Sequence, residues 1–412
     1  MNTDILIIGG GASGLVAALC AKKQAPAARV TIAEKLPRVG KKLLATGNGR
    51  CNIMNALADE MSYAGDTAFI APALKLYKEE YAAFWKELGL FLMTEDEGRM
   101  YPACNQASAV LDVLRMGLQD RGIEEKTDCA VTAIKKSGDG FAAESSLGTI
   151  HCKKVILCTG GQAGKGLGEN DSFRALLTPL GHKIKKTLPA LTWLKAPAAS
   201  LTGLKGVRMK GTIRLTDGKN VLASETGEVL FQESAVSGIA AMQLSLVCAQ
   251  VYANNPAAKL FVVLSPLAMT KDEAKNELLS RRERFGNRSA DMLLTGSMNR
   301  LIALLALKRS GISPGKPAKE LTGVELDRLA SELTAWTIPV LGTGDFASAQ
   351  LMYGGADTDG FSAETLESKC VPGLYACGEL LHVSGPCGGY NLEWAWACGM
   401  LAGRSAGKSL SC

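Results

Sequence analysis

Three glycines near the start of the chain have the spacing of a nucleotide-binding turn. Gly9, Gly11 and Gly14 follow a short apolar segment at residues 4–8 and precede a segment of helical periodicity at residues 15–23. In such a strand–turn–helix unit, the first glycine permits the turn, the second lets backbone amides approach a diphosphate, and the third lets the helix pack on the strand. The spacing therefore predicts that this segment binds a dinucleotide.

An acidic residue follows the next predicted strand. Residues 29–33 are apolar and end at Glu34, about 20 residues beyond the last glycine of the turn, where a carboxylate accepts hydrogen bonds from ribose hydroxyls. An arginine at this place would instead favour a 2′-phosphate. The N-terminal segment thus predicts FAD or NAD as the bound cofactor and argues against NADP.

The C-terminal segment distinguishes FAD from NAD. Residues 371–377 are predicted to form a strand that runs into Gly378 and Glu379, a polar end suited to the ribityl and phosphate part of a flavin. More glycines follow, and then a helix is expected at residues 392–406, whose N-terminal amides can face a ligand. Such a helix end would stabilise negative charge on a reduced flavin. A glycine-rich turn that merely begins a terminal helix is the alternative, but the two ends together favour FAD.

Composition and charge exclude several other classes of protein. With 412 residues, 47% of them hydrophobic, the chain can form a sizeable core and two or three domains. The net charge of +6 is mild, and no basic run interleaved with aromatic residues suggests a nucleic-acid partner. Glycines interrupt the apolar stretch at residues 5–21, so neither a signal peptide nor a membrane span is expected.

The cysteines and histidines indicate a reduced, metal-free protein. Twelve cysteines are scattered without regular spacing, which is typical of reduced thiols and predicts a cytoplasmic location. No pair has the spacing of a redox-active dithiol, so a flavin disulfide reductase is not expected. His151, His182 and His382 lie too far apart in the sequence to form a local zinc motif.

The element pattern predicts an α/β protein with a discontinuous nucleotide-binding domain. Glycine-punctuated β segments follow residue 190, and helical periodicity dominates residues 271–285, 288–308 and 323–336. We expect four parts: the first part of the FAD domain, a β-rich inserted domain, a helical inserted subdomain and the second part of the FAD domain, at residues 1–189, 190–270, 271–337 and 338–412.

Four segments together carry a resemblance to a known family. They are KKLLATGNGRCN at residues 41–52, GEVLFQESAVSG at 227–238, GGADTDGFSAETLESK at 354–369 and GLYACGELLHVSGPCGGYNLEWAW at 373–396. Over essentially its whole length the chain resembles the bacterial BaiN/RdsA family of FAD-dependent oxidoreductases, also called the aminoacetone oxidase family. The resemblance implies a Rossmann-type FAD-binding domain of the glutathione reductase superfamily, interrupted by a β-barrel-like domain and a helical subdomain.

The resemblance also implies which residues bind FAD. In the N-terminal half, the diphosphate would be bound by Gly9, Gly11, Ala12, Ser13 and Gly14, and the ribose by Glu34 and Lys35. The flavin would be lined by Lys41, Lys42, Gly47, Arg50, Cys51 and Asn52. The adenine would be contacted by Val131, and the nucleotide would be flanked by Thr159, Gly160 and Gly161. In the C-terminal half, those at the ribityl chain and the ring are Gly378, Glu379, Gly388, Gly389, Tyr390, Asn391 and Leu392. The basic, glycine-rich loop at residues 35–55 could instead be a solvated surface loop.

Two departures from the family pattern weaken any inference about the substrate. His382 stands where the family often has aspartate, and residues 162–171 lack the usual serine, tyrosine and proline. The interpretation that we favour is a reductase of a small organic or steroid-like enone, with hydride transfer at flavin N5 and NADH or NADPH as a transient donor. The oligomeric state is not predicted.

Candidate catalytic groups lie close to the flavin segments. His382 and Tyr390 could deliver a proton, and Cys51 could contact the flavin as a thiol, although ordinary packing is an alternative for all three. Other functions stay open: a flavin amine oxidase of the aminoacetone type that uses oxygen, or a non-enzymatic flavin redox sensor. An RNA-modifying flavoprotein of related fold is disfavoured by the small net charge.

Overall fold

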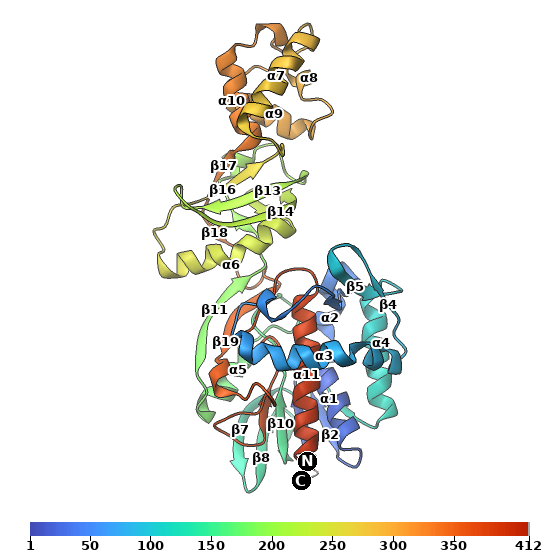
Figure 1. Cartoon of the computed structure of the whole chain (residues 1–412). Coiled ribbons are helices and arrows are strands. Elements are labelled where there is room, and N and C mark those ends of the chain that lie inside the picture. Colours follow the sequence, from blue (N-terminus) through green and yellow to red (C-terminus); the bar gives the residue numbers. More distant parts are fainter. Residues whose placement is uncertain (411–412) are drawn as a thin grey trace. The chain divides into compact units, whose positions relative to one another are not determined.

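The structure is a computed structural model and describes residues 1–410. Contacts within the chain define two compact units, Met1–Leu188 with Leu351–Cys412, and Pro189–Gln350 (Figure 1). The first unit is discontinuous in sequence. Both ends of the chain therefore contribute to one fold.

A parallel sheet of five strands forms the centre of the first unit, in the order β20-β10-β1-β2-β6. Parallel strands that are covered on both faces consist of continuous apolar runs, and the segment ILII of β1 is completely buried. All carboxyl ends of the strands lie at one edge of the sheet. The strands are β1 (Ile5–Ile8), β2 (Val30–Ala33), β6 (Glu124–Lys126), β10 (Lys154–Leu157) and β20 (Leu374–Ala376).

Smaller sheets and six α-helices complete this unit within residues 1–410. The helices are α1 (Ala12–Gln24), α2 (Lys41–Ala45), α3 (Thr67–Glu87), α4 (Ala107–Asp120) and α5 (Ser172–Leu177), followed by the terminal helix α11 (Tyr390–Lys408). The additional strands pair as β3 (Met54–Asn55), β5 (Arg99–Pro102) and β4 (Leu92–Thr94); as β7 (Val131–Ser137), β8 (Gly140–Ser145) and β9 (Gly148–Cys152); and as β11 (Ile184–Ala190) with β19 (Leu351–Ala356).

Helices α1 and α11 are in unusually close contact. Gly399, Gly403 and Gly407 recur every four residues and so lie on one face of α11. A Cβ atom at Gly403 would lie only 2.3 Å from the backbone oxygen of Ala17 in α1. Only glycine allows this approach. We did not predict the close packing of α1 on α11 from the sequence, although the four-residue spacing of these glycines indicates it.

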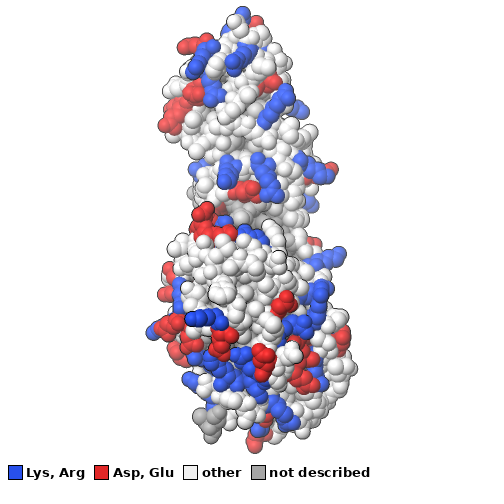
Figure 2. Space-filling model, turned by 90° about the vertical axis from the view of Figure 1, so that its right-hand side faces the viewer, with Lys and Arg blue, Asp and Glu red and all other residues white. Residues whose placement is uncertain are grey.

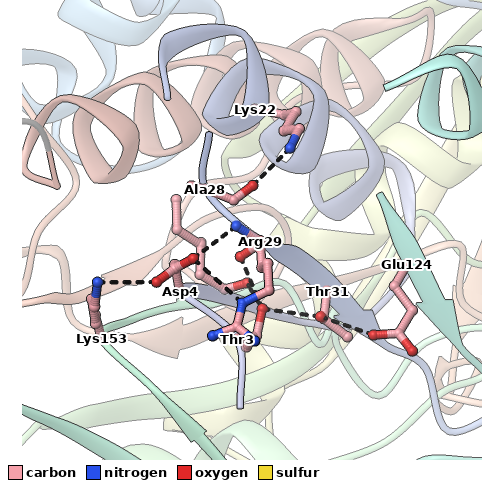
Figure 3. A network of polar contacts seen from close by, with 9 residues as sticks. Thr3, Asp4, Lys22, Ala28, Arg29, Thr31, Glu124 and Lys153 are labelled. Atoms are coloured by element: carbon pink, nitrogen blue, oxygen red, sulfur yellow. Dashed lines mark hydrogen bonds and ion pairs between the residues drawn. The ribbon is translucent and has the colours of Figure 1, made fainter. Parts of the chain in front are cut away.

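A polar network fixes the amino ends of the central strands (Figure 3). Asp4 accepts one hydrogen bond from the backbone of Arg29 at 2.8 Å and pairs with Lys153 at 3.1 Å. The Thr3 hydroxyl donates to the carbonyl of Arg29 at 2.9 Å and accepts from the Thr31 hydroxyl at 3.0 Å. The network lies at the edge of the sheet opposite the glycine turn, so its role is structural.

A seven-stranded sheet dominates the second unit, in the order β17-β16-β13-β14-β15-β12-β18. Its edge strands, β17 and β18, are separated in sequence by Leu341 alone. The sheet must therefore curl until its edges approach each other, which makes it barrel-like. The strands are β12 (Leu194–Lys195), β13 (Arg208–Thr216), β14 (Val221–Phe231), β15 (Ala235–Ser237), β16 (Leu260–Ser265), β17 (Trp336–Val340) and β18 (Gly342–Thr343).

The pairing of these strands corrects one predicted boundary. We expected the chain to return to the FAD domain at residue 338, but β17 pairs with β16 and β18 pairs with β12. Residues 338–350 consequently belong to the second unit, and the return occurs at Leu351.

Helices form two separate cores in the second unit. Helix α6 (Ile239–Asn254) packs into the core of the sheet, and four helices share a core of their own: α7 (Lys271–Phe285), α8 (Ala290–Leu293), α9 (Arg300–Arg309) and α10 (Gly323–Thr334). The single helix expected at residues 288–308 is wrong. Gly296 has a φ of +84°, which ends the first segment, and Asn299 caps α9 by accepting from the backbone of Leu301 at 2.9 Å.

Within residues 1–410, none of the helices combines the length and the apolarity needed to cross a membrane. On the face drawn in Figure 2, basic and acidic side chains are interspersed.

Candidate flavin-binding site

The glycine turn has the geometry that the sequence predicts. Gly9 has a φ of +106°, and a Cβ at Gly14 would lie 2.0 Å from the carbonyl oxygen of Gly9. Gly11 differs from both because a Cβ there would meet nothing within 4 Å. It is the N-cap of α1 and provides no side-chain cap, so the first amides of the helix, including those of Ala12 and Ser13, are available to an anion.

Glu34 joins the end of β2 to this turn. Its carboxylate accepts from the backbone of Gly10 at 2.7 Å and from that of Leu36 at 2.9 Å. The carbonyl of Glu34 accepts from Cys129 at 2.8 Å, which brings the segment leading to Val131 beside it. The residues predicted for the ribose and the adenine therefore lie together.

Lys35 faces a neighbouring loop. Its ammonium donates to the carbonyl oxygen of Glu169 at 2.9 Å. The side-chain amide of Asn170 in the same loop donates to the carbonyl of Thr159 at 3.0 Å. Gly160 follows with a φ of +70°, and Gly161 lies against Glu379. This loop thus connects the two predicted nucleotide segments.

The loop at residues 46–52 is held in an uncommon backbone conformation. Gly47, Asn48, Gly49 and Cys51 all have positive φ, a region that favours glycine and tolerates asparagine. Arg50 fixes this loop.

The guanidinium of Arg50 has several partners within the protein. It donates twice to the side-chain oxygen of Asn105, at 3.0 and 2.7 Å, and forms an ion pair with Glu95. It also lies 4.0 Å from the ring centroid of Tyr101. The structure therefore gives the Arg50 side chain an anchoring role for the loop.

An ion pair links this N-terminal region to the C-terminal segment. The ammonium of Lys42 lies 2.6 Å from one carboxylate oxygen of Glu379. Lys41, beside it at the start of α2, is partly exposed, as is Lys42. The other oxygen of Glu379 accepts from the backbone of Met352 at 2.9 Å. Residues 337 positions apart in the sequence thus meet at one place.

The start of α11 is built by a tight turn. Gly388 and Gly389 have φ of +119° and +105°, and a Cβ at Gly389 would lie 2.5 Å from the carbonyl of Met54. Asn391 supports the turn because its side chain both accepts from the backbone of Gly385 at 2.8 Å and donates to its carbonyl at 2.9 Å. No side chain caps the helix, so its first amides can face a ligand, and Leu392 follows in this first turn.

Two proposed proton donors differ in their protonation. Burial lowers the pKa of His382, and the charge of Lys185 lowers it further, so its imidazole is largely neutral at pH 7. Burial raises the pKa of Tyr390, so its phenol keeps its proton. Tyr390 packs edge-on against Tyr63 at 6.0 Å, and His382 packs edge-on against Tyr353 at 4.8 Å. At neutral pH the phenol of Tyr390 therefore carries its proton, and the imidazole of His382 is largely uncharged.

Cys51 is a buried thiol, and its burial raises the pKa to about 12. At about pH 8, on the order of one thiol in ten thousand is then ionised. We expect iodoacetamide to label the exposed Cys104 and Cys370 in the native protein and to leave Cys51 unlabelled, as read by peptide mass spectrometry. If Cys51 were labelled as fast as Cys104, the interpretation of Cys51 as an inert thiol would be wrong.

Unsatisfied polar atoms gather in the segments predicted to bind the flavin. Within residues 1–410, eight buried side-chain oxygen or nitrogen atoms lack a hydrogen-bond partner, which is uncommon in a folded interior. Those in or beside the flavin segments are Asn52 Oδ1, Thr159 Oγ1, Gln162 Oε1, His382 Nε2, Ser384 Oγ and Glu393 Oε1. A polar ligand such as FAD fits this donor and acceptor set. Among residues 1–410, no cluster of side chains is suited to a metal ion.

Three of these residues escaped the sequence analysis. Gln162 and Ser384 are ordinary loop residues with no local signal. Glu393 could have been noticed, because a charged residue stands within the otherwise apolar LEWAW segment of residues 392–396.

The fold and this site define a Rossmann-type FAD-dependent oxidoreductase. The chain belongs to the HI0933-like family, whose model, described as the HI0933-like protein Rossmann domain, matches residues 3–405. The resemblance inferred from the motifs is thereby confirmed.

Two named relatives cover nearly the whole chain. The chain is 36% identical to the 3-dehydro-bile acid delta(4,6)-reductase of Clostridium scindens over 404 residues, 98% of each protein. It is 26% identical to the ribosomal RNA dihydrouridine synthase of Escherichia coli, over 96% of this chain and 95% of that protein.

Solved structures share the fold at low sequence identity. A quinol fumarate reductase of E. coli aligns with a TM-score of 0.50 at 14% identity, covering 100% of this chain and 71% of that one. A 3-ketosteroid delta1-dehydrogenase from Sterolibacterium denitrificans also gives 0.50, at 12% identity, covering 99% and 100%.

Proposed function

We propose that this protein is a cytoplasmic, NAD(P)H-driven reductase of a conjugated enone in a small organic or steroid-like substrate. The observation that carries the proposal is the 36% identity, over 98% of both chains, to a relative named as a 3-dehydro-bile acid reductase. The two halves of the candidate flavin site, joined by the pair of Lys42 and Glu379, support the same chemistry. The twelve cysteines, scattered without regular spacing, favour a reducing compartment.

FAD supplies hydride transfer at N5 when it is bound. The chain's own groups would then bind and orient it: the amides at the start of α1 would hold the diphosphate, and the uncapped start of α11 would face the pyrimidine end of the ring. Tyr390 keeps its proton because burial raises its pKa, and its hydroxyl is the group that delivers a proton to the substrate carbon. The neutral His382 shapes the site beside it.

Anaerobic stopped-flow absorbance tests this function. The FAD-loaded protein, followed at about 450 nm where oxidised flavin absorbs, is mixed with NADH or NADPH and then with a panel of enones that includes 3-oxo steroids. We expect fast bleaching by a nicotinamide and recovery on addition of an enone. No bleaching by either nicotinamide would refute the proposed donor, and bleaching without recovery would refute the proposed acceptor.

Two controls address the alternative functions. Rapid reoxidation in air with stoichiometric peroxide would instead indicate an oxidase, for which amines such as aminoacetone are the donors to test. Flavin-dependent binding of a protein partner without turnover would indicate a redox sensor.

A second candidate is reduction of a uracil base within RNA. The specific observation in its favour is the 26% identity, over 96% of the chain, to a ribosomal RNA dihydrouridine synthase. On the face drawn in Figure 2, basic and acidic side chains are interspersed and do not form a continuous basic surface. RNA binding favours such a basic surface. Adding ribosomal RNA to the acceptor panel separates the candidates, since only an RNA reductase would be reoxidised by it.

A further inference from the structure

Glu393 is an ionisable group in an unusual position. Of the carboxyl side chains in residues 1–410, only Glu34 and Glu393 are buried, and Glu393 has no exposed surface at all. It lies in the first turn of α11. Helical side chains lean toward the N-terminus of their helix, so its carboxyl group lies behind the turn that begins α11.

The contacts of Glu393 connect it to that turn. One oxygen, Oε2, accepts from the backbone of Asn55 at 3.2 Å, and the side-chain amide of Asn55 donates to the carbonyl of Gly388 at 3.1 Å. The other oxygen, Oε1, is buried without a hydrogen-bond partner. The carboxyl group is therefore one hydrogen-bonded residue away from the turn against which the pyrimidine end of a flavin would lie.

The groups around Glu393 leave its charge poorly compensated. Tyr63 and Tyr77 are buried phenols whose pKa values burial raises well above the usual range, and Tyr390 on α11 is likewise protonated. Lys78 on α3 is the cation that acts on it, and its ammonium donates to the carbonyl of Ala58. Burial raises the pKa of Glu393 to about 7, against the opposing effects of the Asn55 amide and of Lys78.

We propose that Glu393 takes up a proton when the bound FAD is reduced, and that this positioning residue thereby makes the redox potential of the flavin depend on pH. The inference rests on the proposed function in one respect, namely that FAD binds at the start of α11. Reduction delivers two electrons and one proton to the ring from a hydride donor and leaves one negative charge on it. A carboxylate close behind the ring is repelled by that charge, and protonation by a proton from water removes the repulsion.

The sign of the effect follows from linkage. Below about pH 7, Glu393 holds its proton with oxidised and with reduced flavin alike, so reduction takes up no additional proton. Above about pH 7, it is ionised beside the oxidised flavin and protonated beside the reduced one, so reduction consumes a second proton. The slope of the midpoint potential against pH should become about twofold steeper above pH 7. Protonation of the flavin ring itself would steepen the slope toward low pH, which is the opposite direction.

Potentiometric titration of the FAD-loaded protein tests the proposal. The midpoint potential is measured from about pH 6 to about pH 9, with dithionite as reductant and reference dyes of known potential. The protein, Glu393→Gln and Glu80→Gln are compared. Glutamine keeps the shape of the side chain and cannot titrate. Glu80 serves as the matched control because it pairs with Arg404 of α11 at 2.8 Å, farther along the same helix.

The expected result is a steeper slope above pH 7 in the unmodified protein and in Glu80→Gln, and one uniform slope in Glu393→Gln. A uniform slope in the unmodified protein, or an unchanged steep slope in Glu393→Gln, would overturn the proposal. Proton uptake from weak buffer at about pH 8 on reduction by dithionite, corrected for the protons that dithionite releases when it is oxidised, gives the same answer without any variant: about two protons per flavin supports it, and one overturns it.

The two proposals can fail separately. If the protein retains FAD and reduces enones but shows the uniform slope, only the proposed role of Glu393 is refuted. If it shows the steep slope but reduces no enone, only the proposed substrate is refuted. A protein that retains no FAD after loading and desalting refutes both.

Discussion

Replacing Gly11 by alanine is expected to weaken FAD binding at least about 100-fold, or about 2.7 kcal/mol, without changing the fold. A methyl group at Gly11 would meet no protein atom within 4 Å, and the backbone there has φ −81° and ψ −170°, which alanine adopts readily. The methyl group would instead occupy the space through which a diphosphate approaches the helix amides. Titration with FAD, followed by flavin fluorescence, gives the affinity.

Thermal unfolding of the FAD-free protein supplies the first control. Gly11→Ala should melt within a few degrees of the unmodified protein, since its effect on the folded chain is small. Gly14→Ala should instead melt far lower, because its Cβ would lie 2.0 Å from the oxygen of Gly9. Wild-type FAD affinity in a folded Gly11→Ala protein would show that the diphosphate does not bind at this turn.

Replacing Gly403 by alanine is expected to destabilise the first unit by about 3 kcal/mol or more. The new Cβ would lie 2.3 Å from the oxygen of Ala17 and 3.0 Å from its carbonyl carbon and Cα. Backbone atoms cannot rotate away as a side chain can, so α1 and α11 would have to separate along their contact. Urea unfolding followed by circular dichroism measures the loss, with the transition of the first unit shifted to lower urea.

Gly117→Ala is the matched control for this prediction. Gly117 also lies inside a helix, but the nearest atoms to its added Cβ are side-chain ends, those of Leu88 at 2.7 Å and Leu19 at 3.3 Å. These can move, and alanine favours a helix over glycine by about 1 kcal/mol. We expect a neutral or slightly stabilising effect. Equal destabilisation by both substitutions would mean that close packing of α1 on α11 is not the cause.

Features that depend on neighbouring residues could be predicted from the sequence. The spacing of Gly9, Gly11 and Gly14 after a short apolar strand specifies a turn and a helix because each glycine acts on atoms a few residues away. The helix predicted at residues 271–285 agrees with α7 for the same reason: Thr270 and Glu273 form a capping box at its start. The family followed from motifs that are contiguous in the chain.

The tertiary structure alone decided which distant segments meet. Residues 338–350 belong to the second unit because their strands pair with β16 and β12. This pairing could not be predicted, since both partners lie far away in the sequence. The side chain of Arg50, which the resemblance assigns to the flavin site, contacts Glu95 and Asn105, which are 45 and 55 residues away in the sequence.

Burial followed the same rule. The burial that raises the pKa of Glu393 to about 7 depends on segments far away in the sequence, such as β3, whose Asn55 donates to this carboxyl group. Local spacing fixes backbone conformation over a few residues, whereas pairing, burial and charge depend on which surfaces the folded chain brings together.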